Sequence, residues 1–270
     1  MATVIDLQNL SKIYGFGESS VVALDAVDLV VEKGEFVAIM GPSGSGKSTL
    51  MNLIGLLDRA SHGTYSLDGR DVSKLRPRRQ AKVRRDHVGF IFQSFNLIPN
   101  LTVLENVALP LAYKGVSLVK RLKKASEVLE KVGLTNREYY FPRQLSGGQS
   151  QRTAVARALV NWPSIVLADE PTGNLDSSTS HQIMELLKDI HEGGNTILMV
   201  THNPELTRYA NRVIYMKDGQ IQYDEELAKD EAIDLSDVPA AVEYEQELLG
   251  KKAPTRRKKA LKRHSKKRRK

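Results

Sequence analysis

Short apolar runs separated by longer amphipathic stretches set the pattern of this chain. Six runs predict strands, and several of them are continuously apolar rather than alternating, which is typical of strands buried on both faces of a sheet. The predicted strands are Val4–Leu7, Phe36–Met40, Val88–Phe92, Ile165–Ala168, Ile197–Val200 and Val213–Met216.

Helical patterns lie between these runs, at Lys47–Leu57, Leu118–Val132, Gly147–Leu159 and Ser177–His191. Because strands and helices alternate along the chain, we expect an α/β domain built on a largely parallel sheet. The stretch from about residue 94 to 160 departs from this alternation. It is mostly helical, with turn signals at Pro99, Pro110 and Pro142, and it predicts an inserted helical subdomain.

The net charge of +8 is concentrated at the C-terminal end. Of the 40 Lys and Arg residues, 13 lie in residues 251–270, which contain no acid. Residues 224–250 carry a net charge of −9 and residues 1–223 carry +4. These values predict a nearly balanced globular domain over 1–223, a loosely ordered acidic extension over 224–250 and a disordered basic tail over 251–270.

Two absences narrow the class of protein. The chain has no cysteine, which excludes disulfide frameworks, zinc–thiolate sites and thiol nucleophiles. No apolar run approaches the ~20 residues that span a bilayer, and the mixed polar and acidic residues of the first fifteen positions are unlike a secretory signal. We therefore expect a chain that meets a membrane only through a partner.

A phosphate-binding loop is the strongest chemical signal. The pattern G-x-x-x-x-G-K-[ST] follows a predicted strand and precedes a predicted helix, which is the context that such a loop requires. Its glycines allow backbone amides to surround phosphate oxygens at a helix N-terminus. Lys47 is placed to reach the β- and γ-phosphates, and the Ser48 hydroxyl to bind Mg²⁺. The residues are Gly41, Pro42, Ser43, Gly44, Ser45, Gly46, Lys47, Ser48 and Thr49.

Two carboxylates, Asp169 and Glu170, follow the apolar run Ile165–Ala168. Ligands of parallel α/β sheets bind at the carboxyl ends of strands, so Asp169 suits the Mg²⁺ shell and Glu170 is placed to deprotonate a water molecule. Taken alone, such a pair after a strand is more often a helix N-cap. Together with the phosphate-binding loop, the catalytic interpretation is favoured.

Five further motifs resemble those of the ATP-binding cassette (ABC) ATPases and occur in the order of that family. Ser146, Gly147, Gly148 and Gln149 resemble the signature motif, and Gln93 the Q-loop. Asp176 ends the D-loop motif, His202 matches the switch histidine, and Tyr14 matches the A-loop aromatic residue. Asn203 stands where the family commonly has Asp. Taken singly, the signature could be a Ser N-cap, His202 a core or capping histidine, and Tyr14 a residue packed on the glycine-rich turn.

The resemblance covers roughly residues 2–223 and implies a RecA-like P-loop NTPase core with an antiparallel β subdomain and a helical subdomain. It implies ATP and Mg²⁺ as cofactors, with Ser48, Gln93 and Asp169 as metal ligands and Glu170, His202, Gln93 and Lys47 as the catalytic set. The remaining motif residues bind ATP. Two anion-binding helix starts in one chain suit the family's head-to-tail homodimer, in which each ATP lies between one chain's loop and the other chain's signature motif.

The segments around these motifs are most similar to the macrolide-exporter and lipoprotein-release branch (MacB-like). That branch implies an integral membrane permease of the MacB/FtsX-like type as a separate partner, and a location on the cytoplasmic face of the membrane. The transported substrate, the direction of action and the permease are not encoded in any motif. The alternative is a soluble ABC ATPase that acts on nucleic acid or ribosomes through its basic tail.

Two basic segments allow more than one interpretation. The tail could bind anionic lipid headgroups, bind nucleic acid, or fold back on the acidic extension. Arg70–Arg85 contains eight bases but no interleaved aromatic residue, so a solvated helix face or a contact near the membrane partner is favoured over nucleic-acid binding. The acidic extension carries Val242, Tyr244, Leu248 and Leu249, which could form a short amphipathic helix.

Overall fold

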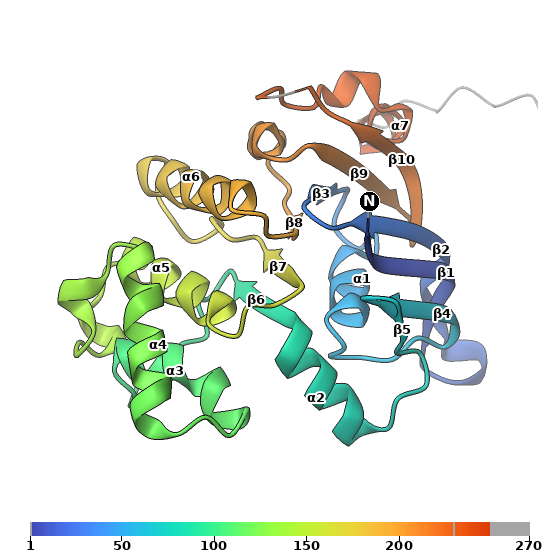
Figure 1. Cartoon of the computed structure of the whole chain (residues 1–270). Helices are drawn as coiled ribbons and strands as arrows, with labels where there is room; N and C mark the ends of the chain where they lie inside the picture. The colour runs from blue at the N-terminus through green and yellow to red at the C-terminus, as the bar shows by residue number, and fades with distance from the viewer. Residues whose placement is uncertain (1, 229, 249–270) are drawn as a thin grey trace, which may run out of the picture.

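A six-stranded sheet forms the centre of the computed structural model, which describes residues 2–228 and 230–248 (Figure 1). The strand order is β10–β9–β3–β8–β7–β6, and all neighbours are parallel except β10, which is antiparallel to β9. Five of the six predicted apolar strands lie in this sheet, so the parallel α/β class is confirmed. The strands are β3 (Phe36–Met40), β6 (Val88–Phe92), β7 (Ile165–Asp169), β8 (Ile197–Val200), β9 (Arg212–Lys217) and β10 (Gln220–Glu226).

A second, antiparallel sheet has the order β2–β1–β4–β5. The predicted strand Val4–Leu7 is only part of the longer β1. Buried and exposed side chains alternate along much of β2, because an antiparallel sheet covers the core with one face only. A search for continuous apolar runs therefore misses most of this sheet. Its strands are β1 (Thr3–Tyr14), β2 (Val21–Glu32), β4 (His62–Leu67) and β5 (Arg70–Asp71), with the short helix η1 (Gly17–Ser19) between β1 and β2.

Helix α1 (Lys47–Ile54) lies between the two sheets and buries Leu50, Met51, Leu53 and Ile54 there (Figure 1). It ends three residues before the predicted Leu57, because Gly55 is its C-cap and Leu56 adopts a left-handed φ of +55°. Helix α2 (Pro77–His87) then connects the antiparallel sheet to β6. The sequence showed α2 only as a run of basic residues.

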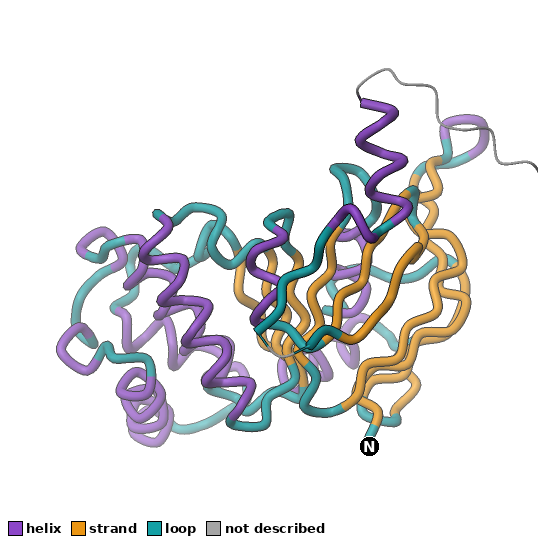
Figure 2. Tube along the Cα trace, turned by 90° about the horizontal axis from the view of Figure 1, so that it is seen from above, coloured by secondary structure: helices purple, strands orange, loops and turns teal. Residues whose placement is uncertain are grey.

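Three helices that pack on one another form a lobe beside the sheets (Figure 1), and Figure 2 shows helices gathered on that side of the strands. They are α3 (Val103–Tyr113), α4 (Leu118–Lys131) and α5 (Gly147–Leu159), with the short helices η2 (Thr135–Arg137) and η3 (Pro142–Gln144) between α4 and α5. The predicted turn at Pro110 is wrong, because this proline lies inside α3. A Thr102–Glu105 capping box starts this helix, and its buried residues recur on one face, so packing outweighs the local preference of proline.

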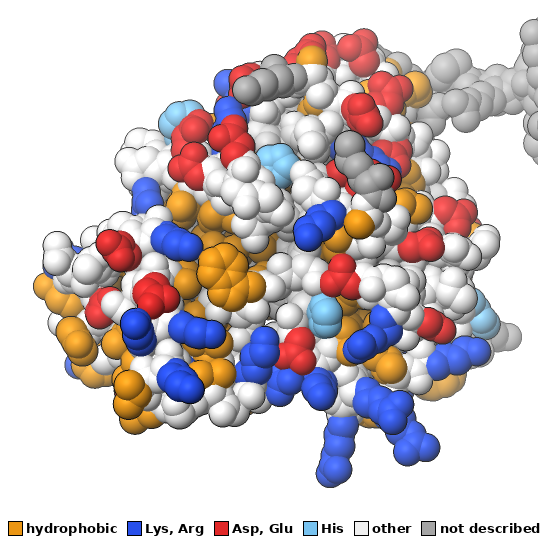
Figure 3. Space-filling view, in the orientation of Figure 1, with side chains coloured by type: hydrophobic (Ala, Val, Ile, Leu, Met, Phe, Trp, Pro, Cys, Tyr) orange, Lys and Arg blue, Asp and Glu red, His pale blue; other side chains and the backbone are white. Residues whose placement is uncertain are grey.

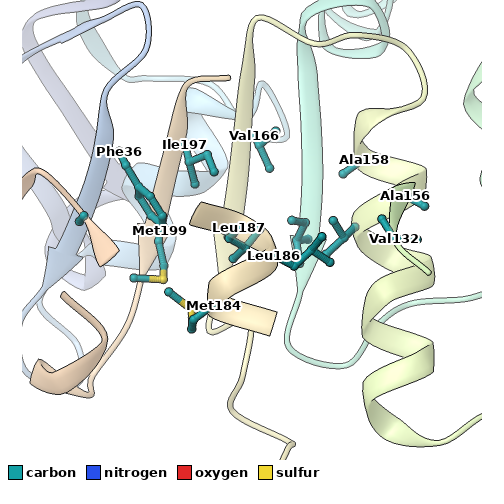
Figure 4. Packing of buried hydrophobic residues seen from close by; sticks show 14 of the residues in the cluster. Phe36, Val132, Ala156, Ala158, Val166, Met184, Leu186, Leu187, Ile197 and Met199 are labelled. Atoms are coloured by element: carbon teal, nitrogen blue, oxygen red, sulfur yellow. The ribbon is translucent and has the colours of Figure 1, made fainter. Parts of the chain in front are cut away.

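The two faces of the central sheet pack against different partners. Along β3, Phe36, Ala38 and Met40 face the core that contains α3 to α6, whereas Val37 and Ile39 face α1 and the antiparallel sheet. Figure 4 shows Met184 and Leu187 of α6 (Ser177–Glu192) beside Phe36 and Met199. Each fully buried Phe, Leu or Met stabilises the fold by ~1.5–3 kcal/mol relative to exposure. Burial on both faces explains why these strands are continuously apolar.

The chain after Tyr223 differs from the loosely ordered extension that we expected. Strand β10 continues to Glu226, and Ile233 and Val238 are buried in the core, so the extension packs against the domain. The short helix η4 (Pro204–Tyr209) lies between β8 and β9, and η5 (Leu235–Asp237) precedes α7 (Pro239–Leu248). The basic tail and Leu249 lie outside the described residues. Within the described ranges, no helix combines the length and apolar character needed to cross a bilayer.

Candidate functional site

The loop of residues 41–49 joins the carboxyl end of β3 to the first turn of α1. Gly41 and Gly46 have φ values of +141° and +98°, and a Cβ on Gly41 would lie 2.1 Å from the carbonyl oxygen of Met216. The buried Ser45 accepts a hydrogen bond on its carbonyl from the Gly219 amide at 3.1 Å. These contacts anchor the loop on the β9–β10 turn and leave the amide groups at the start of α1 available to an anion.

Lys47 is the first residue of α1, and its side chain turns back over the loop. Its Nζ donates to the carbonyl oxygens of Gly41 at 2.8 Å and Pro42 at 2.7 Å. Burial lowers the pKa of Lys47, while the charges of Glu170 and Asp169 act to raise it. The ammonium group therefore lies near both carboxylates of the predicted acidic pair. A phosphate oxygen would be a stronger, charge-assisted acceptor than either carbonyl.

The acidic pair follows β7 at the carboxyl edge of the central sheet. Burial, and then the charge of Glu170, raise the pKa of Asp169, and Lys47 only partly offsets this shift. Glu170 has a φ of +46°, a left-handed conformation that costs a non-glycine residue about 1–3 kcal/mol and is concentrated at functional sites. Its amide donates to the Val200 carbonyl at 3.0 Å, so the neighbouring β8 holds this conformation.

His202 and Glu170, both predicted as catalytic, lie together. His202 Nδ1 is 2.9 Å from Glu170 Oε1, and the histidine side chain is 73% exposed whereas the glutamate side chain is 20% exposed. Asn203 Oδ1 accepts from the Glu205 amide at 3.0 Å, which makes Asn203 the N-cap of η4. Asn and Asp serve almost equally as N-caps, so the departure from the common Asp preserves this local structure.

Gln93 and Asp176 lie on the two segments that border the acidic pair. Asn174 Nδ2 donates to the Gln93 carbonyl at 3.0 Å, and the Gln93 side chain lies against the Cα of Gly173. Asp176 is the N-cap of α6 and accepts from the Thr179 amide at 2.9 Å. Hydrogen bonds from Thr179 and Ser178 hold the pKa of Asp176 well below its usual range, so it is an anion at all moderate pH values.

Tyr14 lies beside the phosphate-binding loop, where its hydroxyl donates to Asp58 Oδ2 at 2.8 Å and also interacts with Thr49. Lys12 Nζ lies 4.7 Å from the centre of the Tyr14 ring and donates to Asp58 Oδ1 at 2.8 Å. The side chain is 41% exposed. A ring held in this way, at its hydroxyl and by a cation, is a rigid surface on which an adenine base could stack.

The signature residues begin α5. Ser146 and Gln149 form a reciprocal capping box, with Ser146 N–H to Gln149 Oε1 at 3.0 Å and Gln149 N–H to Ser146 Oγ at 3.3 Å. The N-cap interpretation therefore describes the side-chain contacts of Ser146. A Cβ on Gly148 would lie 2.5 Å from Thr179 Cγ2, so glycine at this position lets α5 approach the start of α6 closely.

The two candidate anion sites lie on opposite faces of the central sheet. Residues of α1, directly after the phosphate-binding loop, pack in the core shared with Val37 and Ile39. Residues of α5, directly after the signature, pack in the core shared with Phe36 and Ala38. Because alternate residues of one strand point to opposite faces, the central sheet separates α1 from α5.

The predicted magnesium ligands supply suitable chemistry. Ser48 offers a hydroxyl, Gln93 a carboxamide and Asp169 a carboxylate, and Mg²⁺ prefers such oxygen donors, together with phosphates and water. The raised pKa of Asp169 marks a carboxylate whose charge is incompletely compensated, and a bound cation would compensate it. The described residues contain no cluster of three or more His, Cys, Asp or Glu side chains that could hold a metal on its own. A nucleotide would thus complete the ligand set.

Sequence reasoning missed several side chains that organise this site. Lys12 and Asp58 fix Tyr14, but neither belongs to a recognisable motif in the sequence. Tyr209 of η4 contacts His181 of α6, with the hydroxyl oxygen 2.5 Å from Nδ1. These residues are far apart in the chain and belong to no motif, so only their packing shows their proximity.

The structure combines a phosphate-binding loop with an acidic strand end on a RecA-like sheet, and it adds an antiparallel sheet and a helical lobe. This combination defines a P-loop NTPase of the cassette type. A family model described as "ABC transporter" matches residues 24–173. The chain belongs to the ABC transporter family. The resemblance inferred from the order of its motifs is therefore confirmed, as is the fold class.

Individual relatives agree with this assignment. The chain is 50% identical over 222 residues to an uncharacterized ABC transporter ATP-binding protein, YvrO of Bacillus subtilis, covering 82% of this chain and 97% of that protein. It is 50% identical over 218 residues to the macrolide export ATP-binding/permease protein MacB of Hyphomonas neptunium, covering 81% of this chain but only 34% of MacB. The chain thus spans about a third of that longer relative.

A solved structure has the same fold. It is the dimeric structure of a post-hydrolysis state of the ATP-binding cassette MJ0796 bound to ADP and Pi, with a TM-score of 0.76 and 48% sequence identity. The similarity covers 83% of this chain and 99% of that chain. A second dimeric structure of MJ0796, described as a bacterial ABC transporter cassette, matches equally well.

Proposed function

We propose that this chain is the ATP-hydrolysing subunit of an ABC transporter or mechanotransmission complex, and that it drives a separate integral membrane permease of the MacB/FtsX-like type. The observation that carries the proposal is the separation of two anion-binding helix starts by the layers of one sheet. In a head-to-tail homodimer, each phosphate-binding loop would face the partner's signature residues. The dimeric state of the MJ0796 structures supports this arrangement.

Different residues of the site bind the nucleotide, hold Mg²⁺ and catalyse hydrolysis. Lys47 and the amides at the start of α1 bind the β- and γ-phosphates, and Tyr14 stacks on the adenine. Ser48, Gln93 and Asp169 hold Mg²⁺, which neutralises phosphate charge when it is bound. Glu170 accepts a proton from the attacking water, and His202, hydrogen-bonded to Glu170, contacts the γ-phosphate. Ser146, Gly147, Gly148, Gln149 and Asp176 act on the nucleotide of the partner.

A groove between α2 and the helical lobe is the proposed contact for the permease. It has a volume of about 660 Å³. One wall carries bases of α2, which contribute to the Lys and Arg side chains along the lower edge of Figure 3, and the other carries Pro110 and Tyr113. Asn161, which is 9% exposed, also lines the groove, and its Oδ1 lacks a hydrogen-bond partner among the described residues. Strand β6 runs from this groove to Gln93, so a force on the groove would reach the nucleotide site.

Affinity purification from detergent-solubilised membranes tests this partnership. We expect an integral membrane protein to co-purify with the tagged wild-type chain. The double variant Leu57→Asp/Tyr113→Ala should lose it while its ATPase activity and dimerisation in solution are retained, because both residues line the groove and are 47% and 69% exposed, respectively. Tyr139→Ala is the matched control, since Tyr139 is 77% exposed and does not line the groove. Failure to recover a membrane protein with the wild-type chain would contradict the proposed partnership.

The basic tail is proposed to hold the subunit against anionic lipid headgroups. Each Lys or Arg near such a surface contributes about 1 kcal/mol, and salt screens the attraction. Removal of residues 251–270 should therefore abolish flotation of the purified chain with anionic liposomes at low salt, while ATPase activity is unchanged. The full chain should itself dissociate at high salt. Flotation that is the same with and without the tail would contradict the lipid contact.

A further inference from the structure

The C-terminal extension lies across the segment that follows the switch histidine. Its buried residues Ile233, Val238, Ala240 and Ala241 belong to the same core as Ala210 and Val213, and Leu206 and Tyr209 of η4 pack against that core. The Leu227 amide also donates to the Asn211 carbonyl at 2.9 Å. The relative YvrO is matched over 97% of its own length by 222 of the 270 residues of this chain, so part of this chain is additional to that cassette.

One hydroxyl group links the extension to η4. Thr207 is fully buried, and its Oγ1 donates to the Pro204 carbonyl at 2.6 Å and accepts from the Ile233 amide at 2.9 Å. Pro204 is the first residue of η4 and lies two positions after His202. The same oxygen atom therefore holds the start of η4 and the backbone of the extension.

Two further contacts connect these segments to α6. Lys188 Nζ lies 2.7 Å from Asp230 Oδ1, and Tyr209 contacts His181 as described above. A cavity of about 380 Å³ lies between the start of α6 and η4, and Glu170 and His202 line it. His202 is itself largely exposed, and its imidazole Nδ1 lies 2.9 Å from Glu170 Oε1. The position of His202 therefore depends strongly on the backbone segments that precede and follow it, and η4 belongs to the segment that follows.

We propose that residues 227–228 and 230–242 act as a brace that positions the switch histidine, and that Thr207 is the positioning residue through which the brace acts. The inference rests on the proposed role of His202 in ATP hydrolysis. The brace holds η4 through the Thr207 hydroxyl and the apolar residues of the extension. Loosening it lets His202 leave Glu170 while the phosphate-binding loop is undisturbed.

Steady-state ATPase kinetics of full-length Thr207→Val and Thr207→Ser test the brace. Valine keeps the shape of threonine but removes both hydrogen bonds of the hydroxyl, whereas serine keeps them. We expect Thr207→Val to lower kcat about five- to tenfold with the KM for ATP within about twofold, because the side-chain hydrogen bonds that it removes are made with Pro204 and Ile233 and not with the nucleotide-binding residues. Thr207→Ser should restore at least half of the wild-type kcat. A folded Thr207→Val chain with wild-type kcat would overturn the brace.

A double-mutant cycle separates positioning from general destabilisation. In a His202→Ala background, single-turnover hydrolysis should show no further loss on Thr207→Val, because the residue being positioned is absent. Additive losses would overturn the proposal. If His202→Ala alone retains wild-type kcat, the assigned role of His202 fails instead, so failure of the brace and failure of the proposed function are distinguishable.

Val238→Ala provides a second route if Thr207→Val does not fold. Val238 is fully buried in the extension, so its truncation loosens the brace without changing η4 itself. We expect kcat to fall two- to fivefold at unchanged KM. Val31→Ala is the matched control, because Val31 is equally buried but lies in β2, in the other core. Equal kcat values for the two folded variants would count against the brace.

Discussion

Replacement of Glu170 by Gln should abolish ATP turnover and trap an ATP-bound dimer. Glutamine keeps the shape of the side chain and an oxygen that can accept from His202, but it cannot take a proton from the attacking water. General-base catalysis contributes typically 10²–10⁴-fold, so we expect kcat to fall at least a hundredfold. Lys47, Asp169 and the amides of the phosphate-binding loop are unchanged, so ATP should still bind.

Size-exclusion chromatography with light scattering measures the trapped state. In Mg-ATP, the Glu170→Gln chain should elute as a dimer, whereas in ADP or without nucleotide it should elute as a monomer. Glu205→Gln is the matched control, because Glu205 lines the same cavity as Glu170 but is an exposed residue of η4. It should hydrolyse ATP at the wild-type rate. Wild-type turnover by Glu170→Gln would refute the assignment of Glu170 as the general base.

Replacement of Lys47 by Ala should remove ATP binding without unfolding the chain. The ammonium group is the proposed charge-assisted donor to the β- and γ-phosphates, and two such contacts are lost with it. We expect the affinity for Mg-ATP to fall at least about a hundredfold, which corresponds to ~2.7 kcal/mol. Isothermal titration calorimetry measures this loss directly, and retained micromolar affinity would contradict the role of the loop.

The stability of the nucleotide-free Lys47→Ala chain provides an independent check. Burial lowers the pKa of Lys47 in the folded chain relative to the unfolded chain. A lysine with a lowered folded pKa opposes folding at every pH at which it is charged, and this effect disappears only above its unfolded pKa. At neutral pH, the removal of the charge should therefore offset the loss of the hydrogen bonds to Gly41 and Pro42, and Tm should change little. Lys33→Ala, in the exposed turn before β3, should alter neither affinity nor Tm.

Local patterns predicted those parts of the fold in which local and tertiary preferences agree. Strands β3, β6 and β8 and helix α5 have the predicted bounds, because a continuous apolar run suits a strand buried on both faces and Ser146 suits an N-cap. Helix α3 was missed because Pro110 lies within it. Packing of Val103, Val107 and Leu111 stabilises it nevertheless.

In the acidic extension, the sequence predicted less order than the structure has. Its ten acids and fading periodicity predicted loose order, yet Ile233 and Val238 are buried against the domain. Two or three apolar residues suffice when a complementary surface already exists, and that surface is formed by β9 and η4, which are distant from most of the motifs. A periodicity search within the segment cannot detect such a surface.

The sequence by itself determined the family, the parallel sheet and the motifs of the nucleotide site, because each motif is a short segment whose chemistry depends on its own backbone and immediate context. Only the tertiary structure decided how those segments meet. It placed His202 on Glu170, fixed Tyr14 through Lys12 and Asp58, and set the helices that begin at the two candidate anion sites on opposite faces of one sheet. It also placed the extension on Thr207. These side-chain contacts join residues 26 to 46 positions apart, and they are set by how the layers pack rather than by any local pattern.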